Sequence, residues 1–146
     1  MGSKTQLFQT EFLEMTFVGS SSSGIGDTTG IAGLAGPLYV SLHADNPNDY
    51  DDLNSVEVHY VGYARQPLYA ADWIVSGSQV SNRNAIVFPE QQPGEAPSYL
   101  VSFKISQAAS SGAIFLYAGL LDPATNYTGD YVTPIIPAGG LVISED

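Results

Sequence analysis

The chain has 146 residues and a formal net charge of −11, because 15 acidic side chains stand against only 4 basic ones. A chain of this length can bury the core of one domain, and it has no cysteine for disulfides or thiolate metal sites. Its basic residues do not cluster, which excludes the electrostatic attraction that nucleic acids and anionic membranes require. The apolar stretches are too short to span a bilayer, and the N-terminus shows no secretion signal. From these observations together, we expect neither nucleic acid nor membrane as a partner.

Residues 4–18 are the one segment with a helical pattern. Phe8, Phe12 and Met15 recur at i, i+4 and i+7, and Phe17 lies alongside them. A short helix with so many large apolar side chains must bury them on something. Two sites of burial are open at this point: the chain's own β domain, or a neighbouring subunit.

Residues 19–36 are rich in Ser, Gly, Thr and Ala, a composition typical of a loop or tether. We therefore expect two parts in the chain. Residues 1–36 are predicted to form an assembly arm, made of the helix and the tether, and residues 37–146 to form the main domain.

From residue 37 onward the pattern is that of β-strands. Residues 38–43 alternate apolar and polar side chains, which predicts a half-buried strand whose polar face carries His43. Further strands are predicted at residues 56–60, 63–65, 73–75, 86–88, 99–105, 114–118 and 141–143, with a return strand from residue 80. About seven or eight short strands at this spacing predict an antiparallel β-sandwich, jelly-roll-like or immunoglobulin-like, with one short N-terminal helix.

Residues 45–52 form the best candidate for a metal site, because they hold four carboxylates. Carboxylate oxygens suit calcium, but the loop lacks the central glycine and the terminal glutamate of an EF-hand. Since Asn and Asp are also common turn residues, a solvated acidic loop is the favoured interpretation. His43 and His59 lie near this loop without a nucleophile motif beside them. We expect no enzyme activity, no catalytic residue, no cofactor and no bound metal.

The surface is predicted to be poor in charge and rich in tyrosine. Charged residues make up only 13% of the chain, about half the usual fraction, and nine tyrosines take their place. Tyrosine is enriched in interfaces, so we expect a surface that packs against neighbours. Arg65 is predicted to pair with an acid, inside the subunit or across an interface, and Trp73 is predicted to anchor the core. The candidate interface residues are Phe8, Phe12, Met15, Phe17, Tyr39, Arg65, Tyr127 and Tyr131.

Several short motifs recur together in this order. They are residues 38–43 (LYVSLH) with Asp45 and Pro47 following, 60–65 (YVGYAR), Trp73 with Val75, Gly77, Val80, Ser81 and Asn82, 85–89 (AIVFP), 116–119 (LYAG) and 141–146. With these motifs and the N-terminal helix, the chain resembles a family of small structural proteins of tailed bacteriophages that are commonly labelled tail-fibre proteins. The acidic loop at 45–54 and the Tyr-rich segment at 127–131 depart from that pattern.

The resemblance implies a non-enzymatic virion protein that is assembled in the bacterial cytoplasm. The favoured location of the protein in the virion is the capsid exterior, where it would act as a decoration or cement protein bound to the major capsid protein. The alternative is a tail-fibre or tail-tip protein involved in host-surface attachment, with tail proteins as partners, and a glycan-cleaving enzyme is a remote third. A homo-oligomer is expected, with a trimer as one option.

Overall fold

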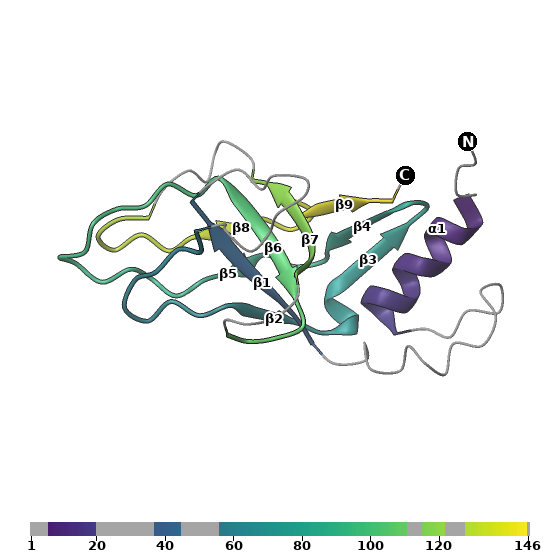
Figure 1. Ribbon diagram of the computed structural model, residues 1–146, viewed down its shortest axis with the longest axis horizontal. Coiled ribbons are helices and arrows are strands. Elements are labelled where there is room, and N and C mark those ends of the chain that lie inside the picture. Colours follow the sequence, from purple (N-terminus) through teal and green to yellow (C-terminus); the bar gives the residue numbers. More distant parts are fainter. Residues whose placement is uncertain (1–5, 20–36, 45–55, 111–114, 122–127, 146) are drawn as a thin grey trace.

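The computed structural model describes residues 6–19, 37–44, 56–110, 115–121 and 128–145 (Figure 1). The helical elements are α1 (Gln6–Leu13), the π-helical turn η1 (Glu14–Val18) and the 3-10 turn η4 (Ala70–Asp72). The strands are β1 (Leu38–His43), β2 (Gln66–Leu68), β3 (Trp73–Ser76), β4 (Gln79–Asn82), β5 (Ile86–Val87), β6 (Ser102–Ser106), β7 (Phe115–Leu120), β8 (Ile135–Ile136) and β9 (Val142–Ser144). The predicted all-β class with one short N-terminal helix is confirmed.

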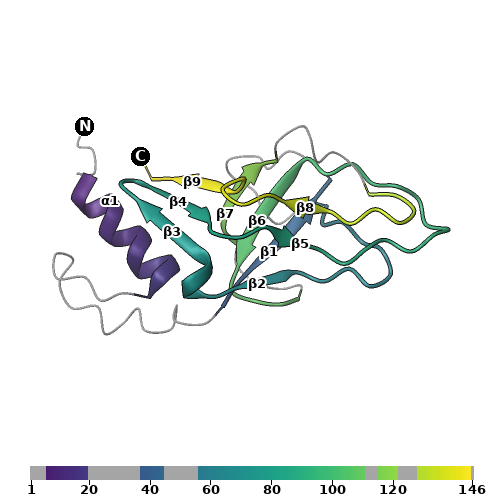
Figure 2. The same cartoon turned by 180° about the vertical axis from the view of Figure 1, so that it is seen from behind.

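The strands form three antiparallel sheets. Their orders are β2-β1-β6-β7, β3-β4-β9 and β5-β8. Because β4 leads into β5 and β8 leads into β9, the two smaller sheets continue one another along the chain. Figures 1 and 2 show this arrangement from opposite sides, with the four-stranded sheet crossing the smaller ones in a sandwich-like fold. No helix among the described segments is long and apolar enough to cross a membrane.

The hydrophobic core lies on one face of the four-stranded sheet. Val40 pairs with Ile105, and Leu42 with Phe103, and all four side chains are buried. On β7, Gly119 lies opposite Phe103, and a Cβ atom there would come within 2.6 Å of the phenylalanine ring. A side chain at residue 119 would therefore collide with the core, which explains a glycine within β7.

The other face of this sheet differs from the prediction. Ser41 and His43 were expected on the polar face of a half-buried strand, but both are buried, and so is Lys104 on the neighbouring strand β6. Ser41 Oγ lies 2.8 Å from His43 Nε2, and Lys104 Nζ lies 4.8 Å from the centre of the Phe115 ring. Period-two alternation shows which side chains share a face, but it does not show whether the polar face is covered. The prediction that this strand is half-buried was therefore wrong, whereas its apolar face was predicted correctly.

Two other predicted strands are shorter than the pattern indicated. Residues 56–60 form only one isolated bridge, between His43 and Glu57, and Val56 is 60% exposed. The run at 99–105 becomes a regular strand only from Ser102, because Tyr99 is 75% exposed and makes an isolated bridge. Alternation along the sequence therefore overestimates how far regular pairing extends at these two places in the described part of the chain.

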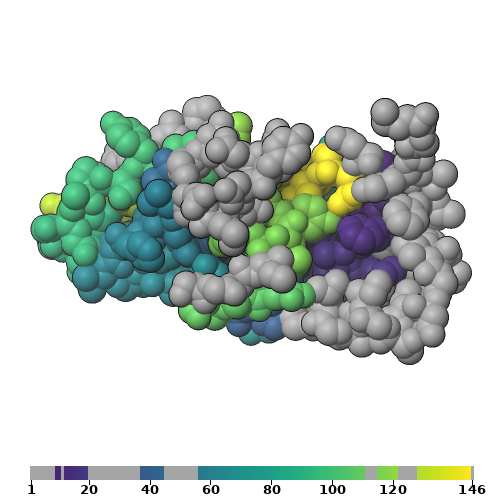
Figure 3. All heavy atoms as spheres, viewed as in Figure 1, coloured from purple at the N-terminus to yellow at the C-terminus, as the bar shows by residue number. Residues whose placement is uncertain are grey.

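The N-terminal helix packs on the chain's own β domain. Phe17 is 3% exposed and its ring contacts the Trp73 ring edge-on at 4.7 Å between centroids, which also confirms Trp73 as a core residue. Thr10 Oγ1 donates a hydrogen bond to the Gly77 carbonyl at the β3–β4 turn, at 2.6 Å. Figure 3 shows the helix, in purple, beside β7 in green and β9 in yellow. The first of the two open sites of burial is therefore the one observed for the end of the helix.

Candidate functional site

The helical candidates for an interface lie mainly inside the chain's own core. Met15 and Phe17 are buried, and Phe12 is half-buried. The side chain of Phe8 lies outside the described side chains. Surface contact by Met15 and Phe17 would therefore require the helix to leave its place on the β domain, while Phe12 can reach a neighbour without that change.

The tyrosine candidates occupy different environments. Tyr39 on β1 is half-buried, and Tyr131 is 68% exposed in a loop near β8. Tyr127 and the acidic loop at 45–52 lie outside the described residues. Their roles in contact or calcium binding stay predictions, whereas Tyr131 is placed where a partner can reach it.

Arg65 forms a buried ion pair within the chain. Its Nε donates to Glu57 Oε1 at 2.9 Å and its Nη2 donates to Glu57 Oε2 at 2.7 Å, so the pair is bidentate. The Nη1 group donates to Ser106 Oγ at 3.1 Å and to the Ala108 carbonyl at 3.0 Å. The predicted pairing with an acid is confirmed, and the acid belongs to the same subunit. This geometry uses most of the guanidinium's donors inside the chain.

The ion pair keeps Glu57 ionised. Burial by itself opposes its charge, but the hydrogen bonds and the positive charge of Arg65 outweigh burial, so the pKa of Glu57 lies below its ordinary value of 4.5. The Tyr63 hydroxyl donates to Glu57 Oε1 at 3.1 Å and accepts a hydrogen bond from the Leu42 N–H at 3.0 Å. Burial is the main cause of the raised pKa of Tyr63, so its hydroxyl keeps its proton.

This depressed pKa predicts a pH-dependent contribution to stability. Replacing Glu57→Gln removes the charge while keeping the shape. The stability advantage of the wild type over this variant should be fully present above pH 4.5, the ordinary pKa, and should be lost as the pH falls through the lower folded pKa. The measurement is the difference in melting temperature between the two proteins at about pH 7 and at about pH 3. A difference that stays constant across this window would contradict the ionised pair.

Three loops meet at the end of the molecule that lies opposite α1 (Figure 1). We name residues 60–63, 89–99 and 128–132 the loop tip. The Tyr60 hydroxyl donates to the Pro89 carbonyl at 2.6 Å, which joins the first loop to the second. The Val61 N–H lies 2.9 and 3.1 Å from the two carboxylate oxygens of Glu95 and adds a second link. These long-range hydrogen bonds hold the first two loops in one arrangement.

The third loop is tied to the second in the same way. The Tyr131 N–H donates to the Gln91 carbonyl at 2.9 Å, and the Gly94 N–H donates to Asp130 Oδ1 at 3.1 Å. Gln91 is fully buried, and its Nε2 donates to the carbonyls of Glu95 and Ala96 at 3.4 and 3.3 Å. Pro93 and Gly94 are common turn residues, so the sequence around Gln91 indicates an ordinary turn. It gives no signal for the burial of the Gln91 side chain, whose backbone is also paired with residues 131 and 132 far along the chain.

The loop tip presents apolar and aromatic side chains to solvent. Val61, Tyr99 and Tyr131 are 69%, 75% and 68% exposed. Tyr131 has a φ of 61°, and it is the one non-glycine residue with a positive φ in the described segments. A tyrosine is rarely found in this region, and such residues persist where the surrounding structure fixes them. Sequence analysis identified Tyr131 but missed Val61 and Tyr99, whose exposure depends on loop packing.

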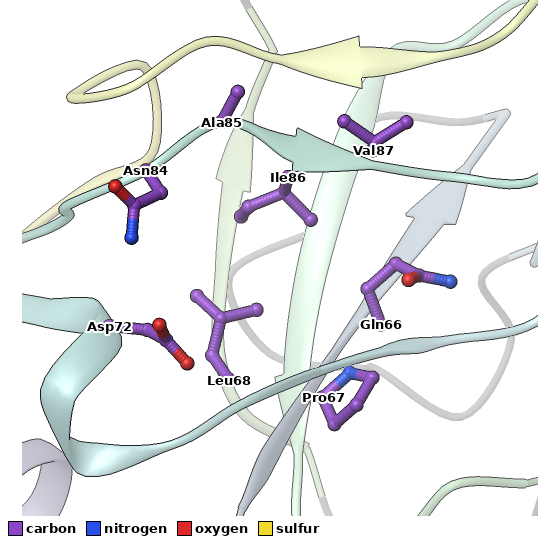
Figure 4. A pocket seen from close by; sticks show the side chains of 8 residues that line it. All are labelled: Gln66, Pro67, Leu68, Asp72, Asn84, Ala85, Ile86 and Val87. Carbon is purple, nitrogen blue, oxygen red and sulfur yellow. The ribbon is translucent and has the colours of Figure 1, made fainter.

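A small pocket of about 150 Å³ opens on the flank of the sandwich (Figure 4). Leu68 and Ile86 form its apolar floor, and Gln66, Asp72 and Asn84 contribute polar side chains. Asp72 Oδ2 already accepts a hydrogen bond from the Tyr69 N–H at 2.8 Å, which fixes the carboxylate at the start of η4. The pocket can accept hydrogen bonds from a small polar group. Only one carboxylate lines it, whereas glycoside hydrolysis uses a pair.

Comparison with known proteins identifies a family but no curated relative. No curated protein matches the chain. The family model described as "Podophage GP4 fiber I protein gp80" matches residues 28–144. This match spans all of the described strands and most of the chain, and it agrees with the phage resemblance drawn from the motifs. The chain therefore belongs to the podophage GP4 fiber I protein gp80 family and is a structural component of a tailed-phage virion.

Proposed function

We propose that the protein is a fibre-associated virion component that attaches the phage to the host surface through the loop tip, and that it acts by binding rather than by catalysis. The observation that carries this proposal is the exposure of Val61, Tyr99 and Tyr131, which belong to the three loops of the loop tip and are 69%, 75% and 68% exposed. Tyrosine offers a broad apolar ring and a hydroxyl group, which suits contact with glycans or proteins on a cell surface.

The rigidity of the loop tip supports the same role. A binding surface that is already ordered loses less conformational entropy on binding, so more of its contact energy appears as affinity. The links from Val61 to Glu95 and from Tyr131 to Gln91 provide this order before any partner is present. A loop without such links would have to pay that entropy on contact.

The family description changes which of the two virion locations expected from the sequence, the capsid exterior or the tail, is favoured. A capsid decoration role was favoured there, because of the low charge density and the apolar helix. The matched family is named for a fibre, and the apolar end of the helix is buried on its own domain. Both observations favour the tail-side alternative, with other fibre or tail proteins as its partners in the particle.

An adsorption competition tests the proposed function. Cells are incubated with purified wild-type protein before phage are added, and the rate of adsorption is measured. The wild type should slow adsorption, and the Tyr131→Gly and Tyr99→Ser variants should need on the order of tenfold more protein for the same effect. Glycine suits the positive φ at residue 131, so this change removes the ring without straining the turn.

The matched control is Tyr69→Ser, because Tyr69 is 59% exposed but lies outside the loop tip. It should compete as well as the wild type. Cryo-electron microscopy of whole particles supplies the second readout. Density over the capsid shell, or equal competition by the tip variants and the wild type, would contradict the proposal.

A further inference from the structure

We propose that the outer face of the β3-β4-β9 sheet is an interface that binds a second copy of this chain. This interface is separate from the loop tip and does not depend on the proposed function. It begins with the register of the sheet: Ile74 pairs with Ser81, and Ser81 pairs with Val142, so the three side chains form one row across three strands. The next row consists of Ser76, Gln79 and Ser144.

The two faces of this sheet differ in burial. Trp73, Val80 and Ile143 on the inner face are buried in the core. On the outer face, Ile74 is 41% exposed and Val142 is 47% exposed. Two large aliphatic side chains in one row thus face solvent in the single chain, where their burial would be favourable.

The exposed aliphatic surface recurs on the sheet that continues this one along the chain. On β5 and β8, Val87 pairs with Ile135, and their side chains are 52% and 40% exposed. Their neighbours Ile86 and Ile136 pair on the buried side. The ladder of β4 and β5 against β9 and β8 therefore carries aliphatic side chains to solvent at both of its ends.

The charge distribution indicates a second copy as the occupant. The chain carries a formal charge of −11, so two copies repel one another wherever acidic surfaces meet. The two rows of the outer face contain only aliphatic, hydroxyl and amide side chains. Two copies can therefore approach across this face without placing like charges together. A two-fold arrangement would bring each aliphatic row against a copied row, with the hydroxyl and amide groups available for hydrogen bonds.

The charged residues that border the face are engaged inside the chain. Arg83 follows β4, and its Nε donates to the Ala71 carbonyl at 2.9 Å. Glu145 follows β9, and its Oε1 accepts a hydrogen bond from the Tyr117 hydroxyl at 2.7 Å. Neither group needs to be displaced for the face to be covered.

Sedimentation velocity on the full chain over a range of concentrations tests this interface. The wild type should form a dimer or a larger oligomer that dissociates on dilution. Val142→Glu places a charge in the aliphatic row of the interface and should raise the dissociation constant at least about tenfold. The matched control is Val61→Glu, which places the same charge on the loop tip, at a valine that is 69% exposed, and should leave the oligomer unchanged.

A cross-linking experiment keeps the test valid if Val142→Glu fails to fold. Because the chain has no cysteine, Ser81→Cys introduces a single thiol in the centre of the face. A bismaleimide reagent should then yield a covalent dimer, whereas Gln92→Cys on the loop tip should yield none. A wild type that stays monomeric at every concentration, an oligomer that Val142→Glu leaves intact, or equal cross-linking at both thiols would each overturn the interface.

The two tests separate this interface from the proposed function. Tyr131→Gly and Tyr99→Ser should lower competition for adsorption while leaving the oligomer mass unchanged. If the protein fails to compete for adsorption but still forms a concentration-dependent oligomer, only the host-attachment role would be contradicted. A monomer that still competes through its loop tip would overturn only the interface between copies.

Discussion

Phe17→Ala is expected to lower the free energy of unfolding by about 3 kcal/mol or more. The Phe17 side chain is 3% exposed, and its ring lies 4.7 Å from the Trp73 ring and 5.4 Å from the Tyr117 ring. Removing it leaves a cavity between the helix and the sheets, where the surrounding rings can collapse only in part. For a domain of this length the melting temperature should fall by roughly 6–12 °C, as measured by thermal denaturation.

Phe12→Ala is the control for this prediction. Phe12 lies on the same helix but is only half-buried. Its replacement should therefore lower the free energy of unfolding clearly less than the change at Phe17. If Phe17→Ala melted together with the wild type while particles failed to incorporate it, the helix would act as an arm gripping a neighbour. That outcome would contradict the packing described for the helix.

Arg65→Leu is expected to cost about 3 kcal/mol, because it leaves the Glu57 carboxylate without its partner in a largely covered site. The Arg65 side chain is 4% exposed and that of Glu57 is 15% exposed, so solvent can replace little of the lost interaction. The stability of Arg65→Lys should lie between those of Arg65→Leu and the wild type, since an ammonium group keeps the charge but loses the bidentate contact. Chemical denaturation of the three proteins measures the differences.

The double variant Arg65→Leu with Glu57→Gln should recover part of the loss, because it removes the unpaired charge. Arg83→Leu is the matched control: Arg83 is exposed and bonds only backbone carbonyls, so its loss should change stability far less. Equal effects at Arg65 and Arg83, or no recovery in the double variant, would show that the buried pair does not stabilise the fold.

The sequence predicted the parts of the fold that depend on local pattern. Alternation at residues 38–43 identified the apolar face of β1, and the strand at 73–75 was expected to be followed by a return strand from residue 80, as β3 and β4 show. These features involve residues that are close in the chain. Side-chain period and turn chemistry are therefore sufficient to predict them.

The features that were missed depend on residues far apart in sequence. Lys104 resembles an ordinary surface lysine until β6, β1 and β7 are placed side by side, and only then does its position over the Phe115 ring emerge. The loop tip likewise requires Val61, Gln91 and Tyr131 to meet. No local pattern in a single sequence encodes such contacts. The apolar pattern of the helix likewise could not show whether its side chains are buried on the chain's own β domain or on a neighbouring subunit.

The edge-on contact between Phe17 and Trp73 has a spectroscopic consequence. Trp73 is the single tryptophan of the chain and is 2% exposed. Its fluorescence therefore reports on one place in the molecule, the seam where the helix meets the β domain. A red shift that precedes the loss of β-sheet circular dichroism would show the helix detaching first, and a shift upon entry into the particle would reveal a rearrangement of that seam without any added label.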